Sequence, residues 1–246
     1  MAESGEPEGR RQLAFEFGHR PSVDGEDFIV APPNQAAVAW IDSWPDWPAP
    51  ALVVYGPPGC GKSHLASVWQ ARTAALRLIL PLSASLDPLQ AIGDATAVVV
   101  EDVDRWIGAG DAQRQLFHVY NLIAERRGQL MLTARQAPTL WPMTLADLRS
   151  RMAAAPAVAI EPPDEDLVAA LLMKLFADRQ LKVGDEVLTF LLARMDRSFD
   201  AARRLVAALD ETALHARRNV TVPLASEVLR AVGPDGRHDH GHGDGH

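Results

Sequence analysis

The stretch GPPGCGKS, residues 56–63, constrains the fold of this chain more than any other. It matches the pattern G-x-x-x-x-G-K-[ST], follows the apolar run ALVVY (51–55) and opens a segment of helical composition. Glycines let such a loop curl so that its N–H groups face a phosphate at a helix N-terminus. Lys62 is expected at the β- and γ-phosphates and Ser63 at Mg²⁺. The candidate nucleotide-binding residues of the loop are Gly56, Pro57, Pro58, Gly59, Cys60, Gly61, Lys62, Ser63 and His64.

A second motif, AVVVED, ends in Glu101 and Asp102. An apolar run followed by two acids predicts a buried strand that delivers carboxylates to the edge of the sheet where ligands of parallel sheets bind. One carboxylate, assigned to Glu101, would orient Mg²⁺ or its waters, and Asp102 would position an attacking water. Alone, GPPGCGKS could be a chance glycine-rich turn and the acids solvated loop residues, but together they predict a nucleotide site.

Short apolar runs alternate with helical stretches through the first two thirds of the chain. The runs expected as strands are ALVVY (51–55), LRLILPL (76–82), TAVVVED (96–102), QLMLTA (129–134) and PAVAI (156–160). Strands alternating with helices predict an α/β fold, with a parallel sheet flanked by helices. After Pro163 only helical periodicity remains, with Asp164 as an N-cap and Gly184 as a break.

Four segments are therefore expected. Residues 1–24 read as a flexible tail, 25–161 as the α/β nucleotide-binding domain, 162–231 as a small all-helical domain and 232–246 as a disordered tail rich in His and Gly. Four histidines in that last tail could bind a divalent metal weakly, although nothing there organises a coordination sphere.

Composition limits the function. The apolar fraction of 48% is that of a globular protein, and the net charge of −8 argues against a protein whose main role is to neutralise nucleic-acid phosphates. A single cysteine excludes an intramolecular disulfide, and no apolar run is long enough for a membrane span. These features favour a cytoplasmic protein.

Taken in order, several segments resemble the AAA+ P-loop NTPase module of the bacterial replication initiator DnaA. They are DFIVAPPNQAAVAWI, GPPGCGKSHLA, VVVEDVDRW, LFHVYNLIAERRGQLMLTARQAP, DLRSRM and IEPPDEDLVAALLMKLF, which together span roughly residues 27 to 230. DnaA also carries a C-terminal helix-turn-helix domain, whereas only the His/Gly tail follows Val232 here. The chain is therefore most similar to Hda-type regulators, DnaA homologues without that domain.

The resemblance implies roles for particular residues. Hda-type proteins dock on the β sliding clamp through a short N-terminal motif, which Gln12, Leu13, Phe15 and Phe17 of RQLAFEF match; an N-terminal strand is the alternative. Arg151 falls at the arginine finger, the residue that acts on the nucleotide of a neighbouring subunit. The alternative is an ordinary salt-bridged helix end.

Other residues would surround the nucleotide of this chain. Arg203 matches the sensor-II arginine of the helical lid, and Thr133 is the sensor-I candidate, although DnaA-type sequences have an acid where this chain has Arg135. The segment that encloses the adenine matches Phe28, Ile29, Val30 and Asn34, of which the first three could equally be core residues.

The leading hypothesis is a negative regulator of replication initiation. Bound to the clamp and holding ADP or ATP with Mg²⁺, it would present Arg151 to the AAA+ domain of DnaA and stimulate hydrolysis of DnaA-bound ATP. The resemblance also allows a homodimer, with DNA contacted indirectly through the clamp. Two alternatives are an autonomous AAA+ ATPase, such as a helicase loader on single-stranded DNA, and a plain nucleotide-binding scaffold.

Overall fold

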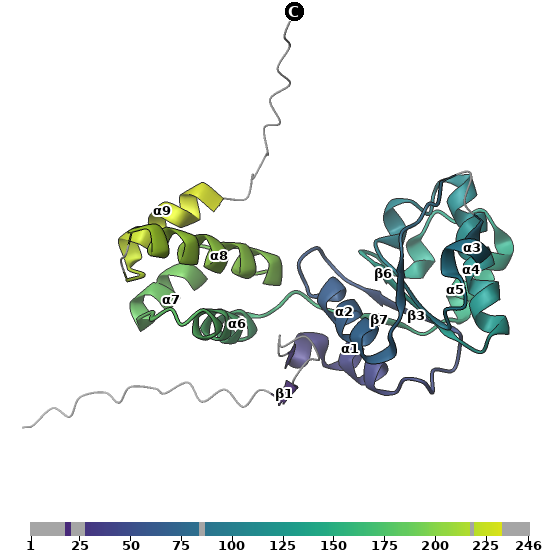
Figure 1. Cartoon of the computed structure of the whole chain (residues 1–246), viewed down its shortest axis with the longest axis horizontal. Coiled ribbons are helices and arrows are strands. Elements are labelled where there is room, and N and C mark those ends of the chain that lie inside the picture. Colours follow the sequence, from purple (N-terminus) through teal and green to yellow (C-terminus); the bar gives the residue numbers. More distant parts are fainter. Residues whose placement is uncertain (1–17, 21–27, 84–86, 217–218, 233–246) are drawn as a thin grey trace, which may run out of the picture.

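The computed structural model describes residues 18–20, 28–83, 87–216 and 219–232, in which an α/β part is followed by a helical part (Figure 1). The strands of the sheet are β3 (Ala51–Tyr55), β4 (Leu76–Leu78), β5 (Ala97–Val100), β6 (Gln129–Ala134) and β7 (Ala157–Ala159). All five run parallel, in the order β4-β5-β6-β3-β7. The predicted parallel sheet is confirmed, and the strand that carries GPPGCGKS lies inside it.

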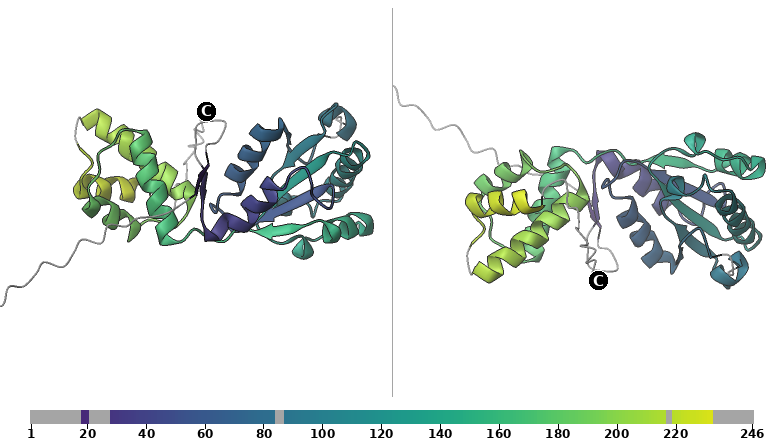
Figure 2. Two further views of the ribbon diagram at one scale, coloured as in Figure 1. Left: turned by 90° about the horizontal axis from the view of Figure 1, so that it is seen from below. Right: turned by 90° about the horizontal axis from the view of Figure 1, so that it is seen from above.

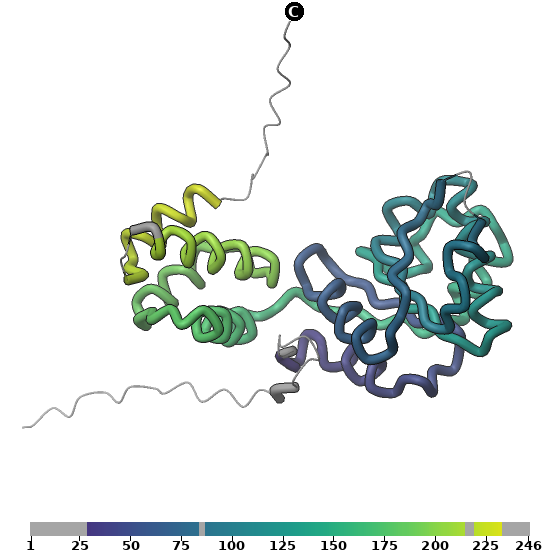
Figure 3. The backbone as a smooth tube through the Cα atoms, viewed as in Figure 1, coloured from purple at the N-terminus to yellow at the C-terminus, as the bar shows by residue number. Residues whose placement is uncertain are grey.

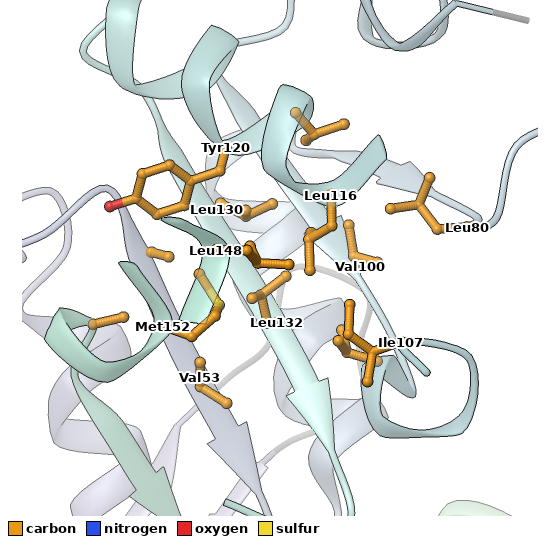
Figure 4. Packing of buried hydrophobic residues seen from close by; sticks show 14 of the residues in the cluster. Val53, Leu80, Val100, Ile107, Leu116, Tyr120, Leu130, Leu132, Leu148 and Met152 are labelled. Atoms are coloured by element: carbon orange, nitrogen blue, oxygen red, sulfur yellow. The ribbon is translucent and has the colours of Figure 1, made fainter. Parts of the chain in front are cut away.

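Helices cover both faces of the sheet, which explains why its strands are apolar throughout (Figure 2). The helices of one layer are α1 (Pro32–Asp42) and α2 (Lys62–Thr73), and those of the other are α3 (Pro88–Ile92), α4 (Gly110–Glu125) and α5 (Ala146–Ala154). Figure 4 shows the second layer, where Leu116 of α4 and Leu148 of α5 pack with Leu132 of β6, all three fully buried. Burial of such a side chain stabilises the fold by about 1.5–3 kcal/mol.

The helical part consists, in the described residues, of α6 (Glu165–Asp178), α7 (Asp185–Leu192), α8 (Phe199–Ala216) and α9 (Val222–Val232). Asp164 is the N-cap predicted from the sequence, since its Oδ1 accepts a hydrogen bond of 2.8 Å from the Leu167 N–H. The helices form their own apolar cluster, and the tube in Figure 3 shows the single connection through which the chain enters them after β7.

A short antiparallel ribbon precedes α1, formed by β1 (Gly18–Arg20) and β2 (Phe28–Val30). Asn34 then fixes the start of α1, because its side chain accepts from the Ala31 N–H at 3.0 Å and donates to the Ile29 carbonyl at 2.9 Å. Ile29 packs into the apolar cluster of the helical part, so this segment joins the two parts of the molecule.

Some local expectations differ from the structure. The strand expected over residues 76–82 ends at Leu78, and Ile79 is 81% exposed. The ribbon, α3 and α9 were not predicted from the sequence. Gln12, Leu13, Phe15 and Phe17 lie outside the described residues. Within the ranges that are described, no helix is both long and apolar enough to cross a membrane.

Two short 3-10 helices connect strands to helices on the α4 side of the sheet. The first, η1 (Val103–Arg105), follows β5, and the second, η2 (Pro138–Leu140), follows β6. Both begin near the carboxyl ends of their strands, so they hold the loops that border the phosphate-loop end of the sheet.

Candidate nucleotide-binding site

The loop between β3 and α2 has the conformation that its glycines predict. Gly59 and Gly61 have φ of +73° and +103°, in the left-handed region that residues with a Cβ rarely adopt. At Gly56 the backbone just after β7 leaves no room for a side chain, because a Cβ would lie 2.2 Å from the Ile160 carbonyl oxygen. The loop therefore requires these glycines for its shape and its close packing.

Lys62 is the first residue of α2 and is buried, with 7% of its surface exposed. Its ammonium donates to the carbonyls of Gly56 at 2.8 Å and Pro57 at 2.9 Å. The charge is thus held inside the loop, beside the N–H groups at the start of α2, where an anion is favoured.

Cys60 belongs to the same loop, and its Sγ lies 3.8 Å from the Lys62 ammonium. Burial raises the pKa of the Cys60 thiol, and the nearby ammonium offsets this effect only in part. The thiol therefore stays protonated near neutral pH, and this position acts as a small apolar residue.

A pocket of about 240 Å³ opens beside this loop, between the α/β part and the start of α8. The residues that line it are Pro58, Gly59, Gly61, Lys62, Ser63, His64, Asp102, Arg135, Phe199, Asp200 and Arg203. Six of the predicted loop residues, with Asp102 and Arg203, thus come together around one space. Phe199, Asp200 and Arg135 had no predicted role there.

The helical part contacts the phosphate loop directly. The Phe199 N–H donates to the Gly59 carbonyl at 2.9 Å, and a Cβ at Gly59 would lie only 2.6 Å from Ser198 Cβ. Arg203 Nη2 lies 3.1 Å from His64 Nδ1, which must be the acceptor because a guanidinium can only donate. Arg204, the next residue, is exposed and is not among the pocket-lining residues, in line with its position on another face of α8.

The two acids after β5 point to different surroundings. Asp102 lines the pocket and lies 3.3 Å from Arg105. Glu101 forms an ion pair with Arg77 of β4, the neighbouring strand, and is not one of the residues that line the pocket. Because Arg77 comes from a distant stretch of sequence, the motif AVVVED alone could not separate the two acids.

Thr133 and the residues expected to enclose the adenine are not among those that line the pocket. Thr133 is 1% exposed, and its Oγ1 accepts a hydrogen bond of 3.2 Å from the Asp102 N–H. Ile29 packs with the helical part, Val30 packs with the α1–α2 layer, and Asn34 holds the turn before α1. Phe28 is placed only by its backbone, in β2.

Arg151 lies outside this pocket, in the last turn of α5. Its guanidinium carbon stands 4.9 Å from the ring centre of Phe117 and 5.0 Å from that of Tyr120, both on α4. Stacking on two aromatic faces holds a cation by electrostatic attraction and limits its motion. Arg149, two residues earlier, is exposed and donates to the Met143 carbonyl.

The pocket offers oxygen ligands suited to a hard cation, namely the Ser63 hydroxyl and the Asp102 carboxylate. Among the residues that the structure describes, no group of three or more His, Cys, Asp or Glu side chains could hold a metal by itself. A magnesium ion would thus need oxygens from a bound phosphate, as is usual for this ion.

Comparison with known proteins supports the same fold. Residues 164–229 match the family model described as the lid domain of Hda. The chain is similar to domain III of the replication initiation protein DnaA from Thermotoga maritima, with a TM-score of 0.72 and 20% identity over 85% of this chain and 95% of that one.

Two structures with bound nucleotide are also similar. DnaA from Aquifex aeolicus bound to AMPPCP has a TM-score of 0.62 and 17% identity, over 86% of this chain and 69% of that one. The AAA domain of FIGL-1 in complex with ADP has a TM-score of 0.54 and 15% identity, over 76% and 73%. At these identities the likeness concerns the fold, and the predicted AAA+ architecture with a helical lid is confirmed.

Proposed function

We propose that this protein restrains replication initiation by stimulating hydrolysis of the ATP held by DnaA, because residues 164–229 match the lid domain of Hda and the fold is similar to that of DnaA domain III. The chemistry would take place at the interface between the two AAA+ domains. Nucleotide bound in the pocket of this chain would set the position of the lid, and thereby the surface that the protein presents to DnaA.

We propose that the pocket binds adenine nucleotide, ADP or ATP. The buried ammonium of Lys62, the glycine-shaped loop and Arg203 on the lid converge on a space of about 240 Å³, and AMPPCP and ADP are bound in similar structures. Ser63 and Asp102 fit Mg²⁺, which would neutralise phosphate charge when bound. Glu101 would join them only after leaving Arg77.

The position of Arg151 is the observation that carries the proposal. The Arg151 guanidinium lies outside the nucleotide pocket of its own chain, on the surface formed by α4 and α5. This position suits a role in the nucleotide site of a partner protein. Arg151 would neutralise the charge that develops on the γ-phosphate of DnaA-bound ATP, an effect worth about 10³–10⁵ in rate in related chemistry. Stacking on Phe117 and Tyr120 would hold the guanidinium at the surface that faces the partner.

The segment Gln12–Phe17 is proposed to bind the β sliding clamp, with Leu13, Phe15 and Phe17 entering an apolar groove. Attachment to a loaded clamp would bring the protein to DNA indirectly and only after replication has begun. A homodimer is also compatible with this scheme.

The test is turnover of ATP by DnaA in the presence of this protein, with and without clamp loaded on DNA. We expect stimulation that depends on the clamp, and its loss in Arg151→Ala. Arg230→Ala is the control, since that exposed arginine of α9 donates within its own helix, to the Ser226 carbonyl.

Two results would reject the proposal. One is a wild-type protein that adds nothing to turnover by DnaA although it binds nucleotide. The other is Arg151→Ala that stimulates as well as Arg230→Ala. Substantial ATPase activity of the isolated protein, insensitive to the clamp, would instead favour an autonomous ATPase.

A further inference from the structure

Gln113 is a buried glutamine of α4, with 2% of its surface exposed. A buried side-chain amide costs free energy unless its polar atoms are hydrogen-bonded, and those of Gln113 are bonded to the segment that leads into α5. We propose that Gln113 is a positioning residue for Arg151, because it fixes the start of α5 and thereby the place of the guanidinium. The inference rests on the proposed role of Arg151 in hydrolysis of the ATP held by DnaA.

Four hydrogen bonds join the Gln113 amide to residues 142–145. Its Oε1 accepts from the Thr144 N–H and the Leu145 N–H, each at 2.9 Å, and from the Thr144 hydroxyl at 3.3 Å. Its Nε2 donates to the Pro142 carbonyl at 3.4 Å. Leu145 is the N-cap residue of α5 and makes no side-chain cap hydrogen bond, so this helix begins at a residue whose N–H is held by α4.

The same face of α4 carries the two aromatic rings that contact Arg151. Phe117 and Tyr120 follow Gln113 by four and seven residues, the spacing of side chains that share one face of a helix. This spacing corresponds to about 6 and 10.5 Å along the axis of α4. Arg151 follows Leu145 by six residues, or about 9 Å along α5. The lengths agree, so a start of α5 held at Gln113 brings Arg151 level with the rings.

Between these two contacts, α5 packs against α4 through apolar side chains. Leu116 of α4 and Leu148 of α5 are fully buried, in a cluster that also holds Tyr120 and Met152 (Figure 4). Apolar burial is not directional, so it holds the helices together without fixing their register. The hydrogen bonds of Gln113 depend on distance and angle, and they therefore set the position of α5 along α4.

The alternative is that Gln113 adds stability and nothing more, and a second glutamine of α4 allows a direct comparison. Gln115 accepts from the Leu82 N–H at 2.8 Å and donates to the Leu82 carbonyl at 3.3 Å. It thus ties α4 to the segment after β4. Because residues two apart do not face each other on a helix, Gln115 lies on another face than Gln113. Loss of its hydrogen bonds should lower stability without moving α5.

The experiment measures ATP turnover by DnaA, with clamp loaded on DNA, at increasing concentrations of the full-length protein. Gln113→Met keeps an unbranched side chain of similar length and removes its hydrogen bonds. We expect maximal stimulation to fall about 10- to 100-fold, since a misplacement of about 1 Å can cost that much in rate. The concentration at half-maximal stimulation should change less than about twofold, because the loss falls on the transition state.

Gln115→Met is the matched control and should stimulate within about twofold of the wild type, although both variants are expected to unfold at a lower temperature. The assay is run at a temperature at which circular dichroism shows the variants folded. If Gln113→Met does not fold, Gln113→Asn takes its place, since its amide stops one methylene short of residues 142–145. A smaller loss of maximal stimulation is then expected, again at unchanged half-saturation.

Two results would overturn the assignment of Gln113. One is maximal stimulation by the Gln113 variant equal to that of Gln115→Met. The other is a loss confined to the concentration at half-maximal stimulation. Failure of the proposed function is distinguishable from both, because the wild type and Gln115→Met would then also leave turnover by DnaA unchanged.

Discussion

Replacing Gly59 by Ala tests whether contact between the lid and the phosphate loop controls nucleotide binding. Gly59 has φ +73°, and an added Cβ would lie 2.6 Å from Ser198 Cβ and 3.0 Å from Ser198 Oγ. Ordinary contact begins at 3.4 Å, so the start of α8 would have to move by about 0.8 Å. Such a shift pulls on the hydrogen bond between the Phe199 N–H and the Gly59 carbonyl, now 2.9 Å.

Two costs follow from this geometry. An alanine in the left-handed region costs about 1–2 kcal/mol, which weakens the fold of the loop itself. Loss of the lid hydrogen bond costs about 0.5–1.5 kcal/mol more. We expect nucleotide affinity to fall about 10- to 100-fold and the melting temperature to fall by about 2–8 °C.

Thermal unfolding and titration with ADP measure the two effects separately. Gly110→Ala is the matched control, because nothing lies within 4 Å of a Cβ at that position and it begins the helix α4. Ser198→Gly should relieve the clash in Gly59→Ala but not the backbone strain. The double variant is therefore expected to recover most of the affinity and to keep the lower melting temperature.

The reasoning about the lid would be refuted by one result in particular. If Gly59→Ala binds ADP as tightly as Gly110→Ala, contact between Ser198 and the loop has no part in binding. If the double variant recovers nothing, the loss comes from the loop alone.

Three further predictions concern single contacts. Phe117→Leu removes one of the two rings that contact Arg151 and should lower the maximal stimulation of ATP turnover by DnaA several-fold, while the concentration of this protein at half-maximal stimulation stays unchanged. Phe117→Trp, which keeps an aromatic ring, should retain the stimulation. Equal stimulation by both variants would contradict this role. Thr133→Val removes the buried Oγ1 that accepts from the Asp102 N–H and should destabilise the fold by about 0.5–1.5 kcal/mol in chemical denaturation, unlike a change at an exposed threonine. Cys60 should react with iodoacetamide at pH 7.5 at least about tenfold more slowly in the folded than in the unfolded protein, because burial keeps its thiol protonated; equal rates would show an accessible thiol.

The sheet could be predicted because its signals are local. ALVVY and QLMLTA are apolar at every buried position except Thr133, and both appear as strands over the expected residues. LRLILPL has the same composition, yet the strand stops at Leu78, and a proline two residues beyond the exposed Ile79 has no N–H for a ladder. Apolar composition alone does not show where pairing ends.

The candidate site was predictable in part, for the same reason. The glycines and the lysine of GPPGCGKS lie within eight residues, so the conformation of the loop and the place of Lys62 in it could be predicted from the sequence. The direction of Glu101 depends on Arg77, which lies 24 residues earlier on the neighbouring strand, and no local pattern encodes that pair. Arg135 could have been found from its place directly after a strand of the sheet, although its distance from the loop in sequence hides the contact.

The contact between Arg203 and His64 links occupancy of the pocket to the position of the lid. Arg203 already donates toward a neutral acceptor, the imidazole of a residue that follows Ser63. A phosphate carries a negative charge that the imidazole of His64 lacks, so a bound nucleotide would draw the guanidinium from His64 toward the phosphates. Since Arg203 lies on α8 and Phe199 begins that helix, this exchange would shift the lid against the phosphate loop. His64→Ala should therefore loosen the lid without nucleotide more than with it, a difference that hydrogen exchange of the α8 amides would measure. Equal protection of α8 in both states would mean that His64 holds no part of the lid.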